Sequence, residues 1–242
     1  MNLLILQYYN TSAEVTNKMI LRIGPLFSKL FSARFLVVIS LFCIGNTQLI
    51  SQPDWEVQRD ESNIKVWTKD YPNSNFKQFK AETTLNTSLQ NVVAVFLDIE
   101  NMGLWYDRVE KVELVEKVSD MEGIYILYFA LPWPVADRIS AVRATLSYEP
   151  NTNTVYVDTN YEPGVITTDT EALLVTNMHS EWELTSTAGG SVHIYHKGYM
   201  DPAGSLPAWI SNSGVKDGPI KTLLALQQKL EDYKDVEVGF LK

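Results

Sequence analysis

The sequence predicts an α+β fold in which a curved antiparallel sheet packs against a long C-terminal helix. Three observations indicate this fold class. Segments rich in Val, Ile, Tyr and Thr follow one another across short polar turns between residues 109 and 199. An amphipathic pattern precedes them at 88–98, and a long helical tract closes the chain. Consecutive strands with short turns form antiparallel meanders, and a curved sheet needs its concave face covered.

Two opening strands are expected before the first helix. Residues 55–68 alternate loosely around Asn63, and residues 76–85 continue with strand-like spacing. Between them, Pro72-Asn73-Ser74-Asn75 has the composition of a turn. The pattern therefore predicts one strand on each side of this turn.

Two short helices are expected after the second strand. Residues 87–90 read Thr-Ser-Leu-Gln, which has the form of a capping box. Apolar residues then follow at i, i+3, i+4 and i+7, namely Leu89, Val92, Val93 and Phe96. These signals predict a helix over 88–98, and a shorter helical turn is expected over 102–106.

The remaining elements are strands and a terminal helix. Six β-rich segments are expected to form the meander: 109–118, 124–129, 138–148, 154–161, 171–185 and 191–199. Ser205-Leu206-Pro207 provides a cap and an early helical proline, so the terminal helix should begin there and end near Tyr233. Pro219 has no N–H and disfavours helix at Gly218, which predicts a kink or a break.

Composition and charge exclude several classes of protein. The 242 residues carry a formal net charge of −9, which argues against nucleic acid as a partner because such binding depends on neutralising phosphates. The single cysteine, Cys43, excludes an intramolecular disulfide and a cage of thiolates. His193 and His196 should face opposite sides of a strand, so they do not suggest a metal site. We expect no metal and no cofactor.

Residues 1–51 are predicted to lie outside the folded domain. Arg22, Lys29 and Arg34 precede an apolar run over 35–44 in which Ser40 is the one polar residue, and this is the pattern of a secretory signal peptide. A membrane-spanning helix needs about 20 apolar residues, so this run is too short to cross a bilayer. A buried amphipathic helix is the alternative. We therefore expect an exported protein, periplasmic or extracellular, with one domain at 52–242.

The mature segment resembles the START family, the steroidogenic acute regulatory protein-related lipid-transfer domains, and in particular its secreted bacterial members. Each motif is weak alone, but their order and spacing are fairly specific over 55–233. The residues that carry the resemblance are Trp55-Glu56-Val57 with Ile64-Lys65-Val66-Trp67, Trp105-Tyr106-Asp107, the segment from Pro132 to Arg138, Val142-Arg143, Pro207-Ala208-Trp209-Ile210 and Asp217-Gly218-Pro219-Ile220.

This resemblance implies a helix-grip fold of the Bet v 1-like superfamily, with a hydrophobic tunnel between the sheet and the terminal helix. Family members of this kind are mostly binding or transfer modules, not enzymes. A lipid is therefore the expected ligand, and burial of about 16 methylenes would contribute on the order of 10 kcal/mol. We expect a monomer that contacts membranes only transiently.

The candidate ligand-binding residues come from these motifs. Arg143 could bind a polar head group, as the resemblance implies; alternatively it faces solvent, because Val142, Ala144 and Leu146 form the more apolar side of its strand. The large apolar residues could line a tunnel or simply fill the core. The candidates are Trp105, Tyr106, Trp133, Arg143, Trp209, Ile210, Leu223 and Leu224.

Two other functions remain open on the sequence alone. The chain could be a cyclase or hydrolase of the wider superfamily that acts on an aromatic or polyketide-like substrate, with Arg143, Tyr125 or a histidine as the acid-base group. No Gly-x-Ser-x-Gly motif and no phosphate-binding loop supports an enzyme. The other possibility is an interaction module whose cavity is filled by its own side chains.

Overall fold

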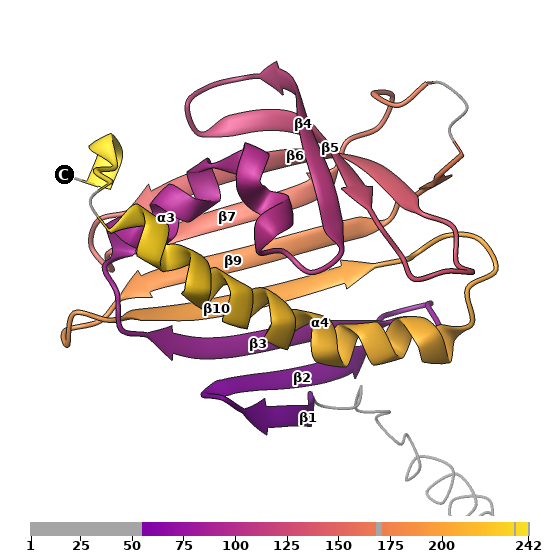
Figure 1. The fold of residues 1–242 in the computed structure, drawn as a ribbon, viewed down its shortest axis with the longest axis horizontal. Helices are drawn as coiled ribbons and strands as arrows, with labels where there is room; N and C mark the ends of the chain where they lie inside the picture. Colours follow the sequence, from indigo (N-terminus) through magenta and orange to yellow (C-terminus); the bar gives the residue numbers. More distant parts are fainter. Residues whose placement is uncertain (1–54, 168–170, 235, 242) are drawn as a thin grey trace, which may run out of the picture. The chain divides into compact units, whose positions relative to one another are not determined.

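The computed structural model describes residues 55–167, 171–234 and 236–241. Within these ranges a ten-stranded sheet has the strand order β1-β2-β3-β10-β9-β7-β6-β5-β4, and β8 pairs with β6 (Figure 1). The strands are β1 (Glu56–Glu61), β2 (Ile64–Asp70), β3 (Lys77–Leu85), β4 (Val109–Lys117), β5 (Glu122–Phe129), β6 (Arg138–Glu149), β7 (Thr154–Tyr161), β8 (Leu173–Leu174), β9 (Met178–Ser186) and β10 (Val192–Met200).

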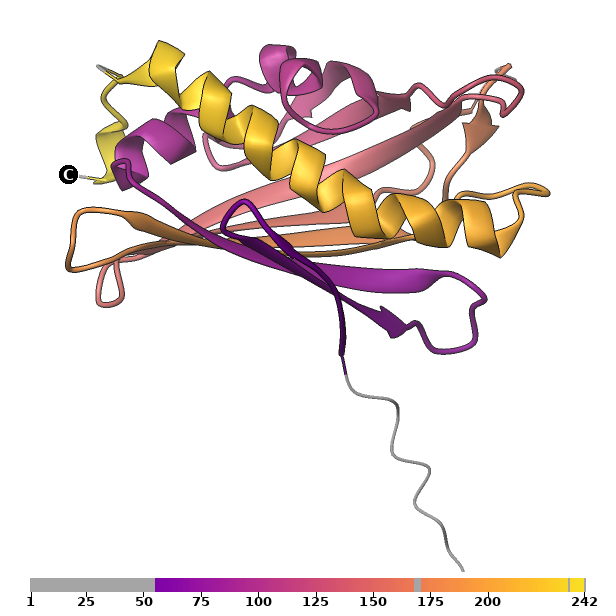
Figure 2. The ribbon, with the colours of Figure 1, turned by 60° about the horizontal axis from the view of Figure 1, so that its bottom comes forward.

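The sheet and the terminal helix confirm the predicted fold class. Every pair along the main path of the sheet is antiparallel, as expected for a meander. β3 pairs with β10, so the three opening strands lie beside the last strand of the chain within one open sheet. The helices lie on one face of the sheet, and α4 crosses that face (Figures 1 and 2).

The opening of the chain differs from the prediction. Residues 55–68 form two strands, β1 and β2, because Ser62 and Asn63 make a two-residue turn between Glu61 and Ile64. Both turn residues have positive φ, 55° and 60°, which is the geometry that matches the twist of a tight hairpin. Asparagine tolerates this conformation, but serine gives little warning of it. The helices therefore follow the third strand.

The first helical region matches its sequence signals. Helix α3 (Leu89–Leu97) begins after Ser88, whose Oγ accepts a hydrogen bond from the Asn91 N–H at 3.2 Å. This bond satisfies one of the N–H groups that a helix leaves unpaired at its start. A 3₁₀ helix, η1 (Ile99–Leu104), follows directly, three residues earlier than the predicted turn at 102–106.

The predicted strand at 171–185 is divided. β8 pairs in parallel with β6 through Arg138 and Leu173, whereas β9 pairs with β7 and β10. The Leu173 and Val175 N–H groups donate to the carbonyls of Asp137 and Ile139, each at 2.9 Å. The segment therefore changes its partner strand before β9 begins, and one continuous strand could not satisfy both pairings.

Helix α4 (Ala208–Lys229) contains Pro219 and continues into η2 (Leu230–Tyr233). The helix is unbroken but changes direction along its length (Figures 1 and 2), so the predicted kink is present and the alternative of a break is not. A last 3₁₀ turn, η3 (Gly239–Leu241), ends the described chain. None of the helices in the described ranges is long and apolar enough to cross a membrane.

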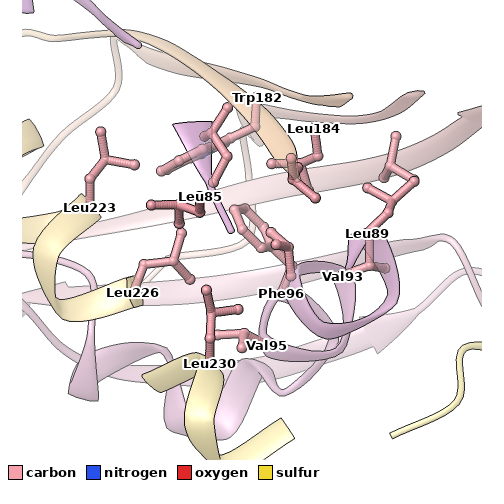
Figure 3. Close-up of a cluster of buried hydrophobic side chains, with 14 of the residues drawn as sticks. Leu85, Leu89, Val93, Val95, Phe96, Trp182, Leu184, Leu223, Leu226 and Leu230 are labelled. Atoms are coloured by element: carbon pink, nitrogen blue, oxygen red, sulfur yellow. The ribbon is translucent and has the colours of Figure 1, made fainter. Parts of the chain in front are cut away.

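The two halves of α4 are attached to the sheet by different interactions. In the first half, Arg59 Nη2 donates to Asp217 Oδ1 at 2.7 Å, and Asn212 Oδ1 accepts from the Lys77 N–H at 2.9 Å. The second half instead buries leucines between α3 and the sheet (Figure 3). Members of this core include Leu223, Leu226 and Leu230 of α4, Val93 and Phe96 of α3, and Trp182 and Leu184 of β9.

The predicted export segment, residues 1–51, lies outside the described residues, and so does Cys43. Its assignment stays a prediction.

Candidate functional site

A cavity of about 160 Å³ lies between the first half of α4 and the sheet, and it is partly open to solvent. Its lining is mainly apolar and includes Phe79, Phe129, Met178, Met200, Ile210 and Val215. A cavity of about 150 Å³ can hold a benzene molecule. The space therefore accommodates a ring or a short chain, and it is smaller than the lipid-length tunnel that the sequence resemblance implies.

Small residues on α4 bring the helix close to the loop after η1. Gly214 and Gly218 line the cavity one helical turn apart. A Cβ at Gly218 would lie 3.2 Å from Asp107 Oδ2, which is a tight contact, and one at Gly214 would lie 3.6 Å from Arg108 Nη2. Thr222 Oγ1 also accepts a hydrogen bond from the Asp107 N–H at 3.0 Å. These contacts fix one wall of the cavity.

Three polar side chains meet inside this apolar lining. Tyr106 Oη lies 3.3 Å from His196 Nε2, and Ser180 Oγ lies 3.1 Å from the same nitrogen. Tyr106 follows η1, whereas His196 and Ser180 lie on neighbouring strands, β10 and β9. All three line the cavity. We call these three residues the polar cluster.

The polar cluster carries no charge at neutral pH. His196 is 1% exposed, and burial holds its pKa well below 6.5, since a buried imidazolium loses its hydration. Burial likewise raises the pKa of Tyr106 to about 12. His196 Nδ1 has no hydrogen-bond partner among the described residues. The cluster is therefore neutral, and one of its buried polar atoms is unsatisfied.

Aromatic rings hold the imidazole in place. Trp182 stacks on His196 with ring centroids 3.5 Å apart and an interplanar angle of 9°. Phe79 meets the same imidazole edge-on at 4.8 Å. Trp182 also contacts Phe96 of the core at 5.0 Å. The polar cluster is thus connected directly to the hydrophobic core, and its position depends on that packing.

A buried arginine lies at another part of the cavity wall. Arg138 is 2% exposed and lines the cavity from the start of β6. Its Nε donates to the carbonyl of Pro202 at 2.8 Å, and its other nitrogens donate to the carbonyls of Ala136 and Ala203. Burial lowers the pKa of Arg138. These bonds anchor the chain before β6 and after β10.

The structure brings two of the eight candidate residues to the cavity, Tyr106 and Ile210. Trp105 and Leu223 are buried in the core, and Leu224 packs against that core. The remaining aromatic candidates are on the surface, with Trp133 92% exposed and Trp209 75% exposed. Contact of any of these residues with a ligand stays a prediction.

Arg143 takes the solvent-facing alternative. It makes ion pairs with Glu122 and Glu162, through Nη1 at 2.5 Å and Nε at 2.9 Å. Its neighbour Val142 packs on the inner face, so alternation along β6 turns Arg143 away from the cavity. The hydrogen bonds that Arg143 donates to both carboxylates raise its pKa. We therefore assign Arg143 a structural role in ion pairs with Glu122 and Glu162, and we do not place it among the cavity-lining residues.

Sequence reasoning does not identify His196 or Ser180 as site residues. His196 is two positions after the buried Ile194, and alternation alone places both on the inner face of β10. That spacing is a usable signal for His196, and His193 indeed points the other way, 3.9 Å from Glu82. Ser180 has no comparable signal, because its role depends on which strand lies beside it.

Comparisons by sequence identify a relative but no family. No protein-family model matches the chain. A curated relative, the uncharacterized protein PA1579 of Pseudomonas aeruginosa, is 24% identical over 178 residues, which cover 74% of this chain and 87% of the relative.

Solved structures are more informative about the fold. A STAR-related lipid transfer protein from Xanthomonas axonopodis is 26% identical, with a TM-score of 0.67 over 74% of this chain and 99% of that one. Human StAR-related lipid transfer protein 5 is 12% identical, with a TM-score of 0.66 over 83% of this chain and 97% of that one. The described chain therefore has the fold of the START-related lipid transfer domains, as its sequence motifs indicate.

Proposed function

We propose that this protein binds a hydrophobic small molecule, most simply a lipid or a related amphiphile, in the cavity beneath α4 and carries it without chemical change. The observation that carries this proposal is the apolar, partly open cavity between α4 and the sheet. Its solved relatives from Xanthomonas and human are named as lipid transfer proteins. Apolar side chains supply the affinity of such sites, and a few polar groups orient the ligand.

The size of the cavity sets what it accepts without rearrangement. A volume of about 160 Å³ suits a ring or the end of an alkyl chain. A longer chain requires the first half of α4 to move outward. That half is attached by the Arg59–Asp217 ion pair and the Asn212 hydrogen bond, whereas the second half is fixed in the core. Outward movement of the first half thus leaves the leucine core intact.

The polar cluster favours binding over acid-base catalysis. Of the acid-base groups considered from the sequence, Arg143 is paired on the outer face and Tyr125 is not among the cavity-lining residues. His196 lines the cavity, but its lowered pKa makes it a weak base at neutral pH. General catalysts work best with a pKa near the operating pH.

The proposal includes export and brief membrane contact. The N-terminal extension and predicted signal peptide, together residues 1–51, would be absent from the mature protein, leaving one acidic domain in the periplasm or outside the cell. An acidic surface does not adhere tightly to anionic lipid. The exposed rings of Trp133 and Trp209 provide apolar groups for a short-lived contact. Amino-terminal sequencing of the protein from cell fractions tests the export step, and an intact residue 1 in the cytoplasm contradicts it.

A pair of tryptophan substitutions tests the binding site. Val215 lines the cavity, so Val215→Trp should fill it and abolish binding of a pyrene-labelled alkyl chain. Ser213 is exposed on the same helix, so Ser213→Trp should leave binding unchanged. Circular dichroism establishes that both variants fold. Unchanged probe affinity in a folded Val215→Trp variant would refute the proposed site, as would failure of the wild-type protein to bind any apolar probe.

A further inference from the structure

We infer that the polar cluster of Tyr106, Ser180 and His196 selects ligands with an uncharged hydroxyl as their polar group. This inference rests on the proposed function and narrows the chemical class of its ligand. It predicts that a fatty alcohol, or another neutral hydroxyl compound, is bound in preference to a fatty acid, a phosphate ester or a quaternary ammonium compound. The cluster, with its three groups from two strands and the end of η1, forms the recognition site.

The hydrogen-bonding inventory of the cluster supports a hydroxyl. Tyr106 Oη and Ser180 Oγ both lie within bonding distance of His196 Nε2, which can engage only one hydrogen at a time. Tyr106 and Ser180 also share a hydrogen bond, so the three groups compete for few hydrogens and oxygen lone pairs are left over in the cavity. A ligand hydroxyl can bond to these two oxygens, whereas His196 Nδ1 has almost no accessible surface and is not open to a ligand.

A hydroxyl fits whichever tautomer His196 adopts. If Nε2 accepts a hydrogen bond from one hydroxyl and the second hydroxyl donates to the first, the cluster presents only oxygen lone pairs to the cavity and needs a donor. If Nε2 donates instead, one hydroxyl hydrogen is left over after the bond between Tyr106 and Ser180, and the cluster needs an acceptor. A ligand hydroxyl both donates and accepts, so it is compatible with either arrangement. A pure acceptor or a pure donor is compatible with only one.

Charge excludes the other common head groups from this position. His196 and Tyr106 are both neutral at pH 7, because burial disfavours their ionised forms. No ionised member of the cluster is therefore present to pair with a carboxylate, a phosphate or an ammonium. Burying an unpaired ion is strongly unfavourable, because the ion loses its hydration without gaining a partner. A neutral hydroxyl avoids that cost.

The charged groups elsewhere on the lining are occupied by protein partners. Arg108 Nε lies 3.6 Å from Asp107 Oδ2, so this cation and anion lie side by side. Arg138 donates to three backbone carbonyls, two of them beyond the end of β10, whereas His196 lies in the middle of that strand. His179 also lines the cavity, and burial lowers its pKa. The cationic lining residues that could compete for an anionic head group are therefore Arg108 and Arg138.

Displacement of a pyrene-labelled alkyl chain by four ligands of equal chain length tests the inference. The ligands are octanol, octane, octanoate and octyltrimethylammonium, at neutral pH. We expect octanol to bind at least about tenfold more tightly than either ion. Tyr106→Phe should lower octanol affinity about threefold to tenfold, the equivalent of one hydrogen bond, and leave octane affinity unchanged. Ser180→Ala should act in the same direction.

Tyr125→Phe is the matched control, because Tyr125 is a partly buried tyrosine that is not among the cavity-lining residues. It should leave all four affinities unchanged. Equal binding of octanol and octane, with no effect of Tyr106→Phe, overturns the inference but leaves the proposed binding function intact. Preference for octanoate that disappears in Arg138→Gln also overturns it and assigns the head group to Arg138. Failure of octanol to displace a bound probe overturns the inference alone, whereas failure of the protein to bind the probe overturns both proposals.

Discussion

Truncation of Leu223 separates a core role from a ligand-binding role. This residue is a candidate for ligand contact from its sequence, but its side chain is 0% exposed in the cluster formed by α4, α3 and β9 (Figure 3). Leu223→Ala removes buried methyl and methylene groups and leaves a cavity, which costs about 2–5 kcal/mol. For a domain of this size, that loss lowers the midpoint of thermal unfolding by roughly 4–20 °C.

The assay is urea and thermal unfolding followed by near-ultraviolet circular dichroism, which reports on the packed tryptophans. Leu224→Ala is the internal control, since Leu224 is only partly buried and its truncation should cost less than that of Leu223. Pyrene-probe affinity is measured on the folded fraction of each variant. A Leu223→Ala protein within about 0.5 kcal/mol of the wild-type free energy of unfolding, but unable to bind the probe, would refute the core assignment.

Three further predictions address other parts of the structure. The hydrogen bond from Tyr233 lowers the pKa of Asp98 below its ordinary value of 3.8, so this contribution to stability is present above about pH 4 and is lost as the pH falls further; Tyr233→Phe should flatten the acid limb of the unfolding curve, and an unchanged limb would contradict this. Gly218→Val should weaken probe binding by forcing the cavity wall apart, whereas Gly239→Val, where a Cβ meets open space, should not; equal effects would exclude the proposed contact. Trp133→Ala should change the free energy of unfolding by less than about 0.5 kcal/mol but slow lipid-probe transfer between vesicles, and a normal transfer rate would remove this residue from the membrane contact.

The sequence was most informative where a local pattern determines the structure. The spacing of Leu89, Val92, Val93 and Phe96 predicts α3 nearly to the residue, because the same spacing buries one face of the helix. The strand at 154–161 is likewise predicted at both ends. The hairpin at Ser62-Asn63 was missed, since its positive φ angles are required by the register of β1 and β2 and not by a strong turn motif.

The candidate site was less predictable, because it depends on neighbours that are distant in the sequence. Ser180 contacts His196 only because β9 and β10 are adjacent, and Tyr106 reaches them from the end of η1. Conversely, sequence motifs alone could not separate the core position of Leu223 from the lining position of Ile210. Both are apolar residues on the same helix, and they differ only in which part of the domain lies beside them.

The different attachments of the two halves of α4 imply a gradient of hydrogen exchange along one continuous helix. Amides near Ser211 can open after the loss of a few polar contacts, whereas amides near Leu226 are protected by the leucine core and should open only with most of the domain. Each 1.4 kcal/mol of difference in opening free energy changes the exchange rate about tenfold. Pro219, which has no amide hydrogen, marks the boundary between the two regimes.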